Sequence, residues 1–367
     1  MSVRTATAKI DIAALIANLS SIKAKAPNAK VLAVLKANAY GHGLERIAKA
    51  LSQGENQADA FGVARIDEAL ALRAAGIISP IVLLEGFFSE DELPILAANN
   101  LQTVVHNQQQ LDAIEQATLE NPLRVWLKVD TGMHRLGVNP DEFAEFYQRL
   151  VQSNNVRNDM VLMSHLSCAD DTDDTRTEQQ IILFNELTAS YDNAKTLANS
   201  AGICAWPESH YQWVRPGLML YGVSPMLPDL SLDRDKLTIA PVMTLQSSII
   251  AKRHIKAGES VGYGAAWTAE TDTNIGVIAI GYGDGYPRHA PNGTPVLVNG
   301  RIVPLVGRVS MDMITVDLGR ESQENIGDTA TLWGKGLPVE EVASFATTIP
   351  YELLCNITRR VQIDVVI

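Results

Sequence analysis

Eight short β-type runs alternate with helix-like stretches rich in Ala, Leu and Glu between residues 14 and 221, and this alternation is what most constrains the fold. The runs are VLAVLK (31–36), AFGVAR (60–65), PIVLLEG (80–86), LQTVVH (101–106), LRVWLKVD (123–130), MVLMSHL (160–166), AKTLANS (194–200) and QWVRPGLMLYG (212–222). Strands that alternate with helices indicate βαβ units and a parallel sheet. Eight units over a span near the roughly 250 residues of a (β/α)8 barrel favour that closed fold over an open doubly wound sheet.

The chain changes character after residues 224–241, a stretch rich in Pro, Asp and Ser that is typical of a linker. Beyond it, short β-type runs are separated by Gly and Asn turns, with few helical stretches. We therefore predict an α/β chain with two domains: a (β/α)8 TIM-type barrel over residues 9–230 and a mostly-β domain over 231–367. Residues 1–8 are expected to add a strand to the second domain.

Composition points to a small-molecule ligand rather than a polyanionic partner. The 367 residues include 42 acidic and 30 basic side chains, a formal net charge of -12, which argues against nucleic acid or an anionic membrane surface as the main partner. The three cysteines, Cys168, Cys204 and Cys355, have no CxxC spacing, so neither a disulfide framework nor a structural zinc site is indicated, and we expect no metal. The first residues lack the apolar core of a signal peptide, and no apolar run has the length of a membrane span. We expect a cytoplasmic protein.

Polar residues gather at the carboxyl ends of the predicted strands, where barrel enzymes build their sites. Lys36 ends the first run and has two interpretations. It is either a strand-end lysine whose amine reaches solvent, or a sheltered reactive amine that traps a carbonyl as a Schiff base. Desolvation favours the neutral, nucleophilic amine, so the inner end of a buried run suits the second interpretation.

The last two runs carry turn segments that are suited to phosphate. ANSAG (198–202) and RPGLMLYG (215–222) lie where barrels commonly hold a phosphate group. The hydroxyl of Ser200 and the backbone amides of Gly217 and Leu218 are suitable donors. A reactive lysine on the first strand with a phosphate cradle on the last two is the pattern that pyridoxal 5'-phosphate (PLP) requires, because PLP needs both an amine and a phosphate anchor.

Eight segments, in order and spread over nearly the whole chain, resemble the PLP-dependent alanine racemase family. They are AVLKANAYGHG, LKVDTGMHRLGV, SHLSCADD, RPGLMLYG, VGYGAAW, GYGDGYPR, VGRVSMDM and YELLCNITRRV. The resemblance implies an amino-acid racemase that interconverts L- and D-alanine by a two-base mechanism on PLP-bound substrate. It also implies the family's usual setting, the supply of D-alanine for peptidoglycan.

The same resemblance implies a role for each matching residue. The two catalytic bases would be Lys36, which would also bind PLP covalently, and Tyr263. The other cofactor contacts would be Tyr40, His165, Asn199, Ser200, Arg215, Gly217, Leu218 and Tyr351. The substrate would contact Arg135, Met311 and Asp312, and the entry corridor would be lined by Asp170, Tyr282 and Arg288. In this family Tyr263, Met311 and Asp312 come from the second subunit, so the resemblance implies a homodimer with shared sites.

Lys128, in LKVDTGMHRLG, also has two interpretations. Lysine is rarely buried, so a surface cation at a strand end is one of them. The family instead carries a carbamylated lysine here, an anion that positions the neighbouring arginine.

Arg215 distinguishes between reactions of PLP. A guanidinium keeps its protons and does not readily pass one to the pyridine nitrogen, so the ring stays a weaker electron sink, which favours racemisation over transamination. An acid there would indicate a decarboxylase or transaminase instead. A broader racemase acting on serine or other amino acids stays open, because the same catalytic pair would serve it. Two further alternatives are opposed by the sequence: a PLP decarboxylase of the same fold by Arg215 and Tyr263, and a non-catalytic PLP-binding protein by the second domain that carries Tyr263.

Overall fold

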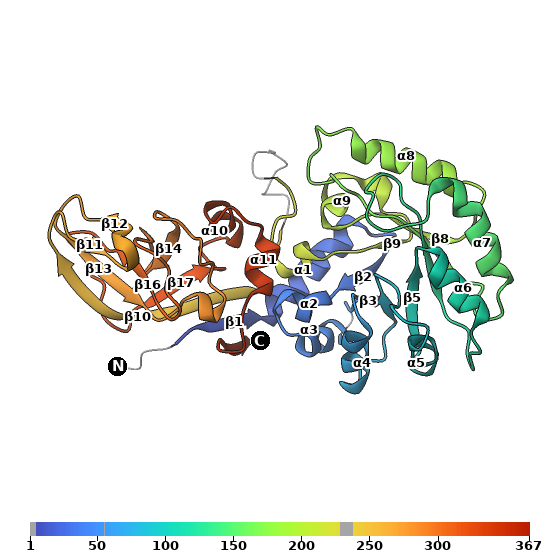
Figure 1. Ribbon diagram of the computed structural model, residues 1–367, viewed down its shortest axis with the longest axis horizontal. Coiled ribbons are helices and arrows are strands. Elements are labelled where there is room, and N and C mark those ends of the chain that lie inside the picture. Colours follow the sequence, from blue (N-terminus) through green and yellow to red (C-terminus); the bar gives the residue numbers. More distant parts are fainter. Residues whose placement is uncertain (1–4, 55, 228–237) are drawn as a thin grey trace.

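The computed structural model describes residues 5–54, 56–227 and 238–367, which form two lobes (Figure 1). One lobe is a closed barrel of eight parallel strands, which confirms the predicted fold class. The strands are β2 (Lys30–Val34), β3 (Ala60–Val63), β4 (Ile81–Leu83), β5 (Leu101–Val105), β6 (Val125–Lys128), β7 (Val161–Met163), β8 (Ala194–Thr196) and β9 (Trp213–Val214). The barrel closes where β9 pairs with β2, with Lys30 opposite Trp213 and Val31 opposite Val214.

Helices connect these strands. They are α1 (Ile12–Lys25), α2 (Lys36–Tyr40), α3 (Leu44–Leu51), α4 (Ile66–Ala74), α5 (Glu92–Ala98), α6 (Gln108–Gln116), α7 (Phe143–Gln152), α8 (Arg176–Thr188) and α9 (Ser200–Ala205). Among its described residues this lobe also has the 3-10 helices η1 (Pro140–Glu142), η2 (Pro207–Ser209) and η3 (Leu218–Tyr221). Three helices begin with a side-chain cap, because Asp11, Asn107 and Asn199 accept the backbone N–H three residues ahead.

The second lobe is mostly strand, as predicted. Its main sheet contains β10 (Met243–Ile255), β13 (Thr273–Ile278), β14 (Pro295–Val298), β15 (Arg301–Pro304), β16 (Ile314–Asp317), β17 (Thr329–Trp333) and β18 (Gln362–Val366). Smaller elements are β11 (Ser260–Val261), β12 (Trp267–Thr268), η5 (Tyr263–Ala265), η6 (Tyr282–Asp284), α10 (Val339–Phe345) and α11 (Pro350–Cys355). No helix among the described residues combines the length and apolar character that a bilayer crossing needs.

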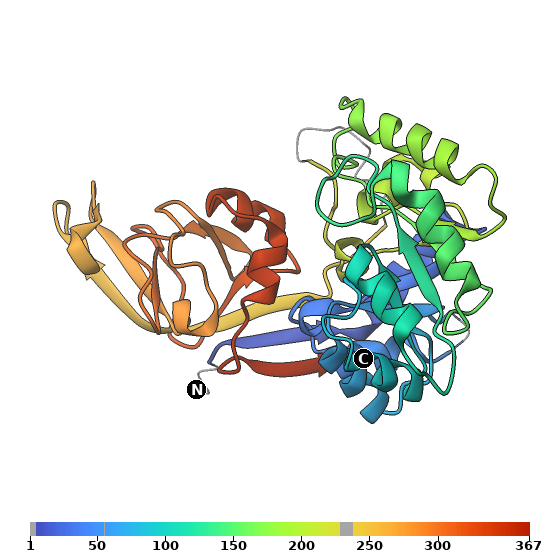
Figure 2. The same ribbon diagram turned by 45° about the vertical axis from the view of Figure 1, so that its right-hand side comes forward.

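The first strand of the chain belongs to the sheet of the second lobe. β1 (Thr7–Asp11) pairs antiparallel with β10 and parallel with β18 (Figure 2). The chain then enters the barrel through α1. The predicted linker at 224–241 includes residues 228–237, which lie outside the described residues.

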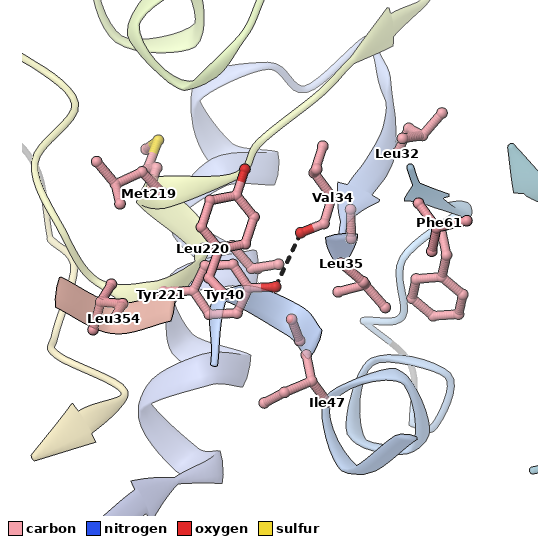
Figure 3. Packing of buried hydrophobic residues seen from close by; sticks show 14 of the residues in the cluster. Leu32, Val34, Leu35, Tyr40, Ile47, Phe61, Met219, Leu220, Tyr221 and Leu354 are labelled. Atoms are coloured by element: carbon pink, nitrogen blue, oxygen red, sulfur yellow. Dashed lines mark hydrogen bonds between the residues drawn. The ribbon is translucent and has the colours of Figure 1, made fainter. Parts of the chain in front are cut away.

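All eight barrel strands are shorter than the runs that predicted them, and two of these differences concern candidate site residues. β2 ends at Val34, so Lys36 is the first residue of α2 rather than the last of a strand, which corrects the sequence prediction. Likewise β9 ends at Val214, and Leu218–Tyr221 form a 3-10 helix. These residues are apolar because they pack in the core beside the barrel, where Tyr221 donates its hydroxyl to the Val34 carbonyl at 2.9 Å (Figure 3).

Candidate active site

A cavity of about 630 Å³ lies at the carboxyl ends of the barrel strands. It brings together many of the residues singled out in the sequence, namely Lys36, Tyr40, Lys128, Arg135, His165, Asn199, Ser200, Arg215, Gly217 and Tyr351. The remaining lining residues are Val34, Leu84, Glu85, Leu136, Met163 and Ile349. Ile349 and Tyr351 come from the second lobe, so both lobes of one chain contribute to the cavity.

Lys36 is followed by one turn of left-handed helix. The φ angles of Ala37, Asn38, Ala39 and Tyr40 are 54°, 56°, 53° and 52°. This conformation costs about 1–2 kcal/mol for each L-residue that adopts it, so the surrounding structure must hold it. Gly41 continues at φ 79°, and a Cβ there would lie 2.0 Å from the Leu354 carbonyl oxygen, so both the angle and the space require glycine.

His42 supports this turn from the core. Its Nδ1 lies 3.0 Å from the Ala39 carbonyl oxygen and 2.8 Å from that of Tyr40. Both partners are acceptors, so Nδ1 carries the proton. Burial lowers the pKa of His42 to about 4, which keeps the ring neutral. The ring stacks on Tyr221 at 4.5 Å between centroids, the same tyrosine that binds the Val34 carbonyl.

The Ser200 hydroxyl organises the loop after β9. Its Oγ accepts the backbone N–H of Gly217 at 2.9 Å and that of Met219 at 3.3 Å. A Cβ on Gly217 would lie 2.6 Å from the Tyr40 hydroxyl oxygen, so this hydroxyl lies directly against the Gly217 backbone. Burial raises the pKa of Tyr40, which keeps its hydroxyl protonated as a donor. Hydroxyls and a backbone turn at one place in the cavity form a donor set that suits phosphate.

Arg215 is buried and fixed by neutral acceptors. Its Nη1 donates to Thr196 Oγ1 at 2.5 Å, and its Nη2 donates to the Ser164 carbonyl at 2.7 Å and the Leu197 carbonyl at 3.1 Å. Burial lowers the pKa of Arg215 to about 9. No acidic side chain of the described residues forms an ion pair with its guanidinium.

Lys128 is buried, with only 5% of its surface exposed, so its interpretation as a surface cation is wrong. Lys128 is the last residue of β6, and it lines the cavity at the carboxyl end of that strand. Burial is the main cause that lowers its pKa to about 7, and the charges of Arg215, Arg135 and Lys36 act in the same direction. Near neutral pH a large fraction of this amine is therefore uncharged.

The cavity carries an excess of positive charge. Four of its described lining residues have basic side chains, Lys36, Lys128, Arg135 and Arg215, against Glu85 as the acid among them. Such a cavity fits an anionic ligand, because an unpaired cluster of cations is costly to bury. An amine, a phosphate donor set and a fixed guanidinium are the groups that PLP requires, so the residues present fit this cofactor.

The other predicted residues lie outside the cavity. Leu218 is buried beside Gly217 at the start of η3. Tyr263 lies on η5 of the second lobe and is 71% exposed, and Met311 is 51% exposed. The cavity lining formed by the described residues of one chain does not include Tyr263, Met311, Asp312, Asp170, Tyr282 or Arg288.

The contacts of four of these outlying residues, Asp312, Asp170, Tyr282 and Met311, show where they lie. Asp312 forms an ion pair with Arg360, with 2.7 Å between Oδ1 and Nη2. The charge of Asp170 adds to burial in raising the pKa of Tyr351, so this acid lies near the second-lobe wall of the cavity. Gly283, beside Tyr282, donates its N–H to the Met311 carbonyl at 2.9 Å, which joins the Tyr282 and Met311 segments.

Glu85 is a site residue that the sequence analysis did not single out. It lies two residues after the end of β4, within the run PIVLLEG. The signal that identified its neighbours, a polar residue at the carboxyl end of a barrel strand, was present here as well.

Comparisons with known proteins agree along the whole chain. Residues 10–225 match the model of the alanine racemase N-terminal domain, and residues 242–365 match that of the C-terminal domain. The alanine racemase of Vibrio parahaemolyticus is 57% identical over 361 residues, which cover 98% of this chain and 99% of that protein.

Solved structures of this kind superpose closely. The biosynthetic alanine racemase from Pseudomonas aeruginosa has a TM-score of 0.94 and 43% identity, covering 99% of this chain and 100% of that one. The alanine racemase from Bartonella henselae, solved with covalently bound pyridoxal phosphate, has a TM-score of 0.88 and 29% identity, covering 99% of each chain.

Proposed function

The chain belongs to the alanine racemase family, and we propose that it interconverts L- and D-alanine with PLP held in the cavity at the end of the barrel. The observation that carries the proposal is that Lys36 and Arg215 line the same cavity. The first offers an amine for the cofactor aldehyde, and the second offers a guanidinium, rather than an acid, for its ring nitrogen.

The cofactor would be held by residues of the barrel. Lys36 would bind it covalently, and Tyr40, Ser200 and the amides of Gly217 and Leu218 would hold its phosphate. His165, Asn199 and Tyr351 would line the remainder of its site. When bound, PLP withdraws electrons from the Cα–H bond of an amino acid attached to it, which makes the Cα proton removable.

Inversion at Cα needs a proton-transfer group on each face of the carbon. Lys36 would serve one face and Tyr263 the other, so that one removes the proton while the other returns a proton from the opposite side. Arg135 would bind the substrate carboxylate, with Met311 and Asp312 beside it. Asp170, Tyr282 and Arg288 would line the route by which alanine enters.

Arg215 would direct the outcome after proton removal. Its guanidinium donates hydrogen bonds to three oxygen acceptors. It would donate another to the ring nitrogen without transferring a proton to it. Facing the ring nitrogen of PLP, such a group would leave that nitrogen unprotonated and the cofactor a weaker electron sink, which would favour return of the proton to Cα. This arrangement favours racemisation over decarboxylation or transamination.

We propose a homodimer in which each site takes Tyr263, Met311 and Asp312 from the partner subunit. In support, Tyr263 and Met311 are large side chains that are more than half exposed, and both lie on the second lobe, away from the cavity of their own chain. We also propose that the protein works in the cytoplasm and supplies D-alanine for peptidoglycan, the usual setting of the family.

Incubation of the protein with PLP and L-alanine in heavy water tests the function. We expect D-alanine to appear with deuterium at Cα, and we expect Lys36→Ala to abolish both inversion and the visible absorbance of bound PLP. If PLP binds and alanine stays L and protiated, alanine racemisation is wrong. A panel including serine, with the same readout, then measures substrate breadth.

A further inference from the structure

Glu68 on α4 links two segments that are separate in the sequence. One carboxylate oxygen, Oε1, accepts the backbone N–H of Ala37 at 2.7 Å. The other, Oε2, accepts the N–H of Ala64 at 2.9 Å and that of Arg65 at 3.3 Å. The side chain therefore connects the first residue of the left-handed turn to the chain that leaves β3.

The position of this contact matters because Ala37 N is bonded directly to the carbonyl carbon of Lys36. The core side of the turn is held by His42 and by Ala39, whose N–H donates to the Leu35 carbonyl at 2.7 Å. Ala37 and Asn38 are exposed, so core packing does not hold the opposite side. There the backbone bonds of the turn, from Gly41 N–H to the Ala37 carbonyl at 3.1 Å and from Gly43 N–H to the Asn38 carbonyl at 2.9 Å, are joined by two side-chain bonds. These run from Ala37 N–H to Glu68 Oε1 and from Leu44 N–H to Asn38 Oδ1, the latter at 2.9 Å, and Glu68 is the partner that comes from another part of the fold.

We propose that Glu68 is a positioning residue: by joining Ala37 to the end of β3, its carboxylate holds the left-handed turn in the conformation that directs Lys36 and Tyr40 into the cavity. The inference rests on the proposed role of Lys36 as the PLP-binding lysine. It goes beyond that role by assigning the alignment of the amine to a side chain that does not line the cavity.

The chemistry of the contact explains why a carboxylate stands here. Three N–H groups on two sides need acceptors, and a carboxylate accepts with both oxygens, whereas an amide accepts with one and donates with the other end. Glu68→Gln therefore places a donor against a donor on one side. Glu68→Asp keeps the charge and both acceptors, but it is one methylene shorter and cannot reach both segments from the same helix.

The test uses the full-length protein as purified and three variants: Glu68→Gln, Glu68→Asp and Asp67→Asn. Asp67 is the exposed neighbouring acid on α4, and its substitution removes the same charge without touching the turn. Hydrogen exchange followed by mass spectrometry monitors peptides that cover residues 35–44, and peptides over residues 69–74 report on α4 itself. The kcat and KM for alanine are measured for the same proteins.

We expect both Glu68 variants to show exchange about tenfold faster within residues 35–44, with α4 unchanged. We also expect kcat to fall about tenfold while KM for alanine stays near the unsubstituted value, because the defect lies in the alignment of the amine rather than in binding of the carboxylate. Asp67→Asn should match the unsubstituted protein in every readout.

Two results would overturn the inference: exchange at the unsubstituted rate in both Glu68 variants, or a loss confined to Glu68→Gln with Glu68→Asp normal, which would mean that joining the two segments is not required. Failure of the proposed function is recognised separately. Borohydride reduction fixes PLP to the lysine that binds it, so, if the proposed function is wrong, reduction of the unsubstituted protein would not attach PLP to Lys36. The hydrogen-exchange comparison needs no cofactor and stays valid in either case.

Discussion

Nη2 of Arg215 lies 3.1 Å from Nδ1 of His165, and the arginine is the donor of this pair. Desolvation and then the Arg215 charge hold the pKa of His165 well below its usual range, so the ring is neutral and Nδ1 is free to accept. Both side chains line the cavity. The guanidinium is thus oriented by His165 as well as by Thr196 Oγ1 and two backbone carbonyls. None of these groups is an acid that could protonate the ring nitrogen in place of Arg215.

Replacement of this arginine tests whether it limits the electron sink. We expect Arg215→Glu to lower racemisation about hundredfold and to raise the fraction of turnovers that end in transamination, because an acid can share a proton with the ring nitrogen. Loss of the visible absorbance of bound PLP during turnover measures that fraction. Arg215→Lys, which keeps the positive charge, should not raise it, and equal fractions in the two variants would contradict the explanation.

Tyr263→Phe separates the two faces of the reaction. We expect PLP to bind as before and racemisation to fall about a thousandfold, because one of the two proton-transfer groups is gone. Lys36 remains, so one enantiomer of alanine should still exchange its Cα proton for deuterium without inversion. Tyr211→Phe, a tyrosine outside the cavity lining, serves as the control. Full racemisation in both directions by Tyr263→Phe would show that the two-base scheme is wrong.

Lys128 is suited to react with carbon dioxide. With a pKa near 7, a large part of the amine is neutral in mildly alkaline buffer, and a carbamate would place a negative charge among Arg215, Arg135 and Lys36. We expect carbon-13 bicarbonate to give a carbamate signal in the NMR spectrum that is absent from Lys128→Met. A crystal structure or mass spectrum with unmodified Lys128 in bicarbonate would argue against it.

His42 makes stability depend on acidity. Its pKa is about 4 in the folded chain and near 6.5 when unfolded, so between these values the unfolded state binds the extra proton. Stability should therefore be fully present above pH 6.5 and fall by about 3 kcal/mol as the pH drops to 4. Urea unfolding at several pH values measures this. His42→Asn keeps a donor that does not titrate, and we expect a shallower loss on acidification. A slope equal to that of the unsubstituted chain would exclude His42 as a cause.

The barrel could be predicted from the sequence because most of its strands are short runs of apolar residues, β8 (Ala-Lys-Thr) being an exception, and because polar residues mark the ends that form the cavity. The same pattern predicts that Lys36, His165 and Arg215 lie together, and all three line the cavity. Burial of Lys128 was harder to foresee, since lysine is usually exposed and its three cationic neighbours lie on other elements.

The left-handed turn could not be predicted from composition. Ala37, Ala39 and Tyr40 have no preference for positive φ, and what holds them comes from elsewhere: Glu68 on α4, and His42 stacked on Tyr221. Such a conformation is decided by tertiary contacts, which a reading of local propensity does not contain. Glu68 was missed for the same reason, because nothing in the α4 sequence indicates a partner 31 residues earlier.

The pairing of β1 with β18 sets an order of events during synthesis. A ribosome adds roughly 5–20 residues each second, so β1 emerges on the order of tens of seconds before the strand that lies beside it in the finished sheet. The barrel strands are all synthesised by Val214, so the barrel can close during this interval, whereas the edge of β1 that faces β18 stays open until Gln362–Val366 leave the ribosome. A nascent chain stalled before β18 would thus hold a finished barrel and an exposed strand, the kind of edge that chaperones bind and that aggregation begins from.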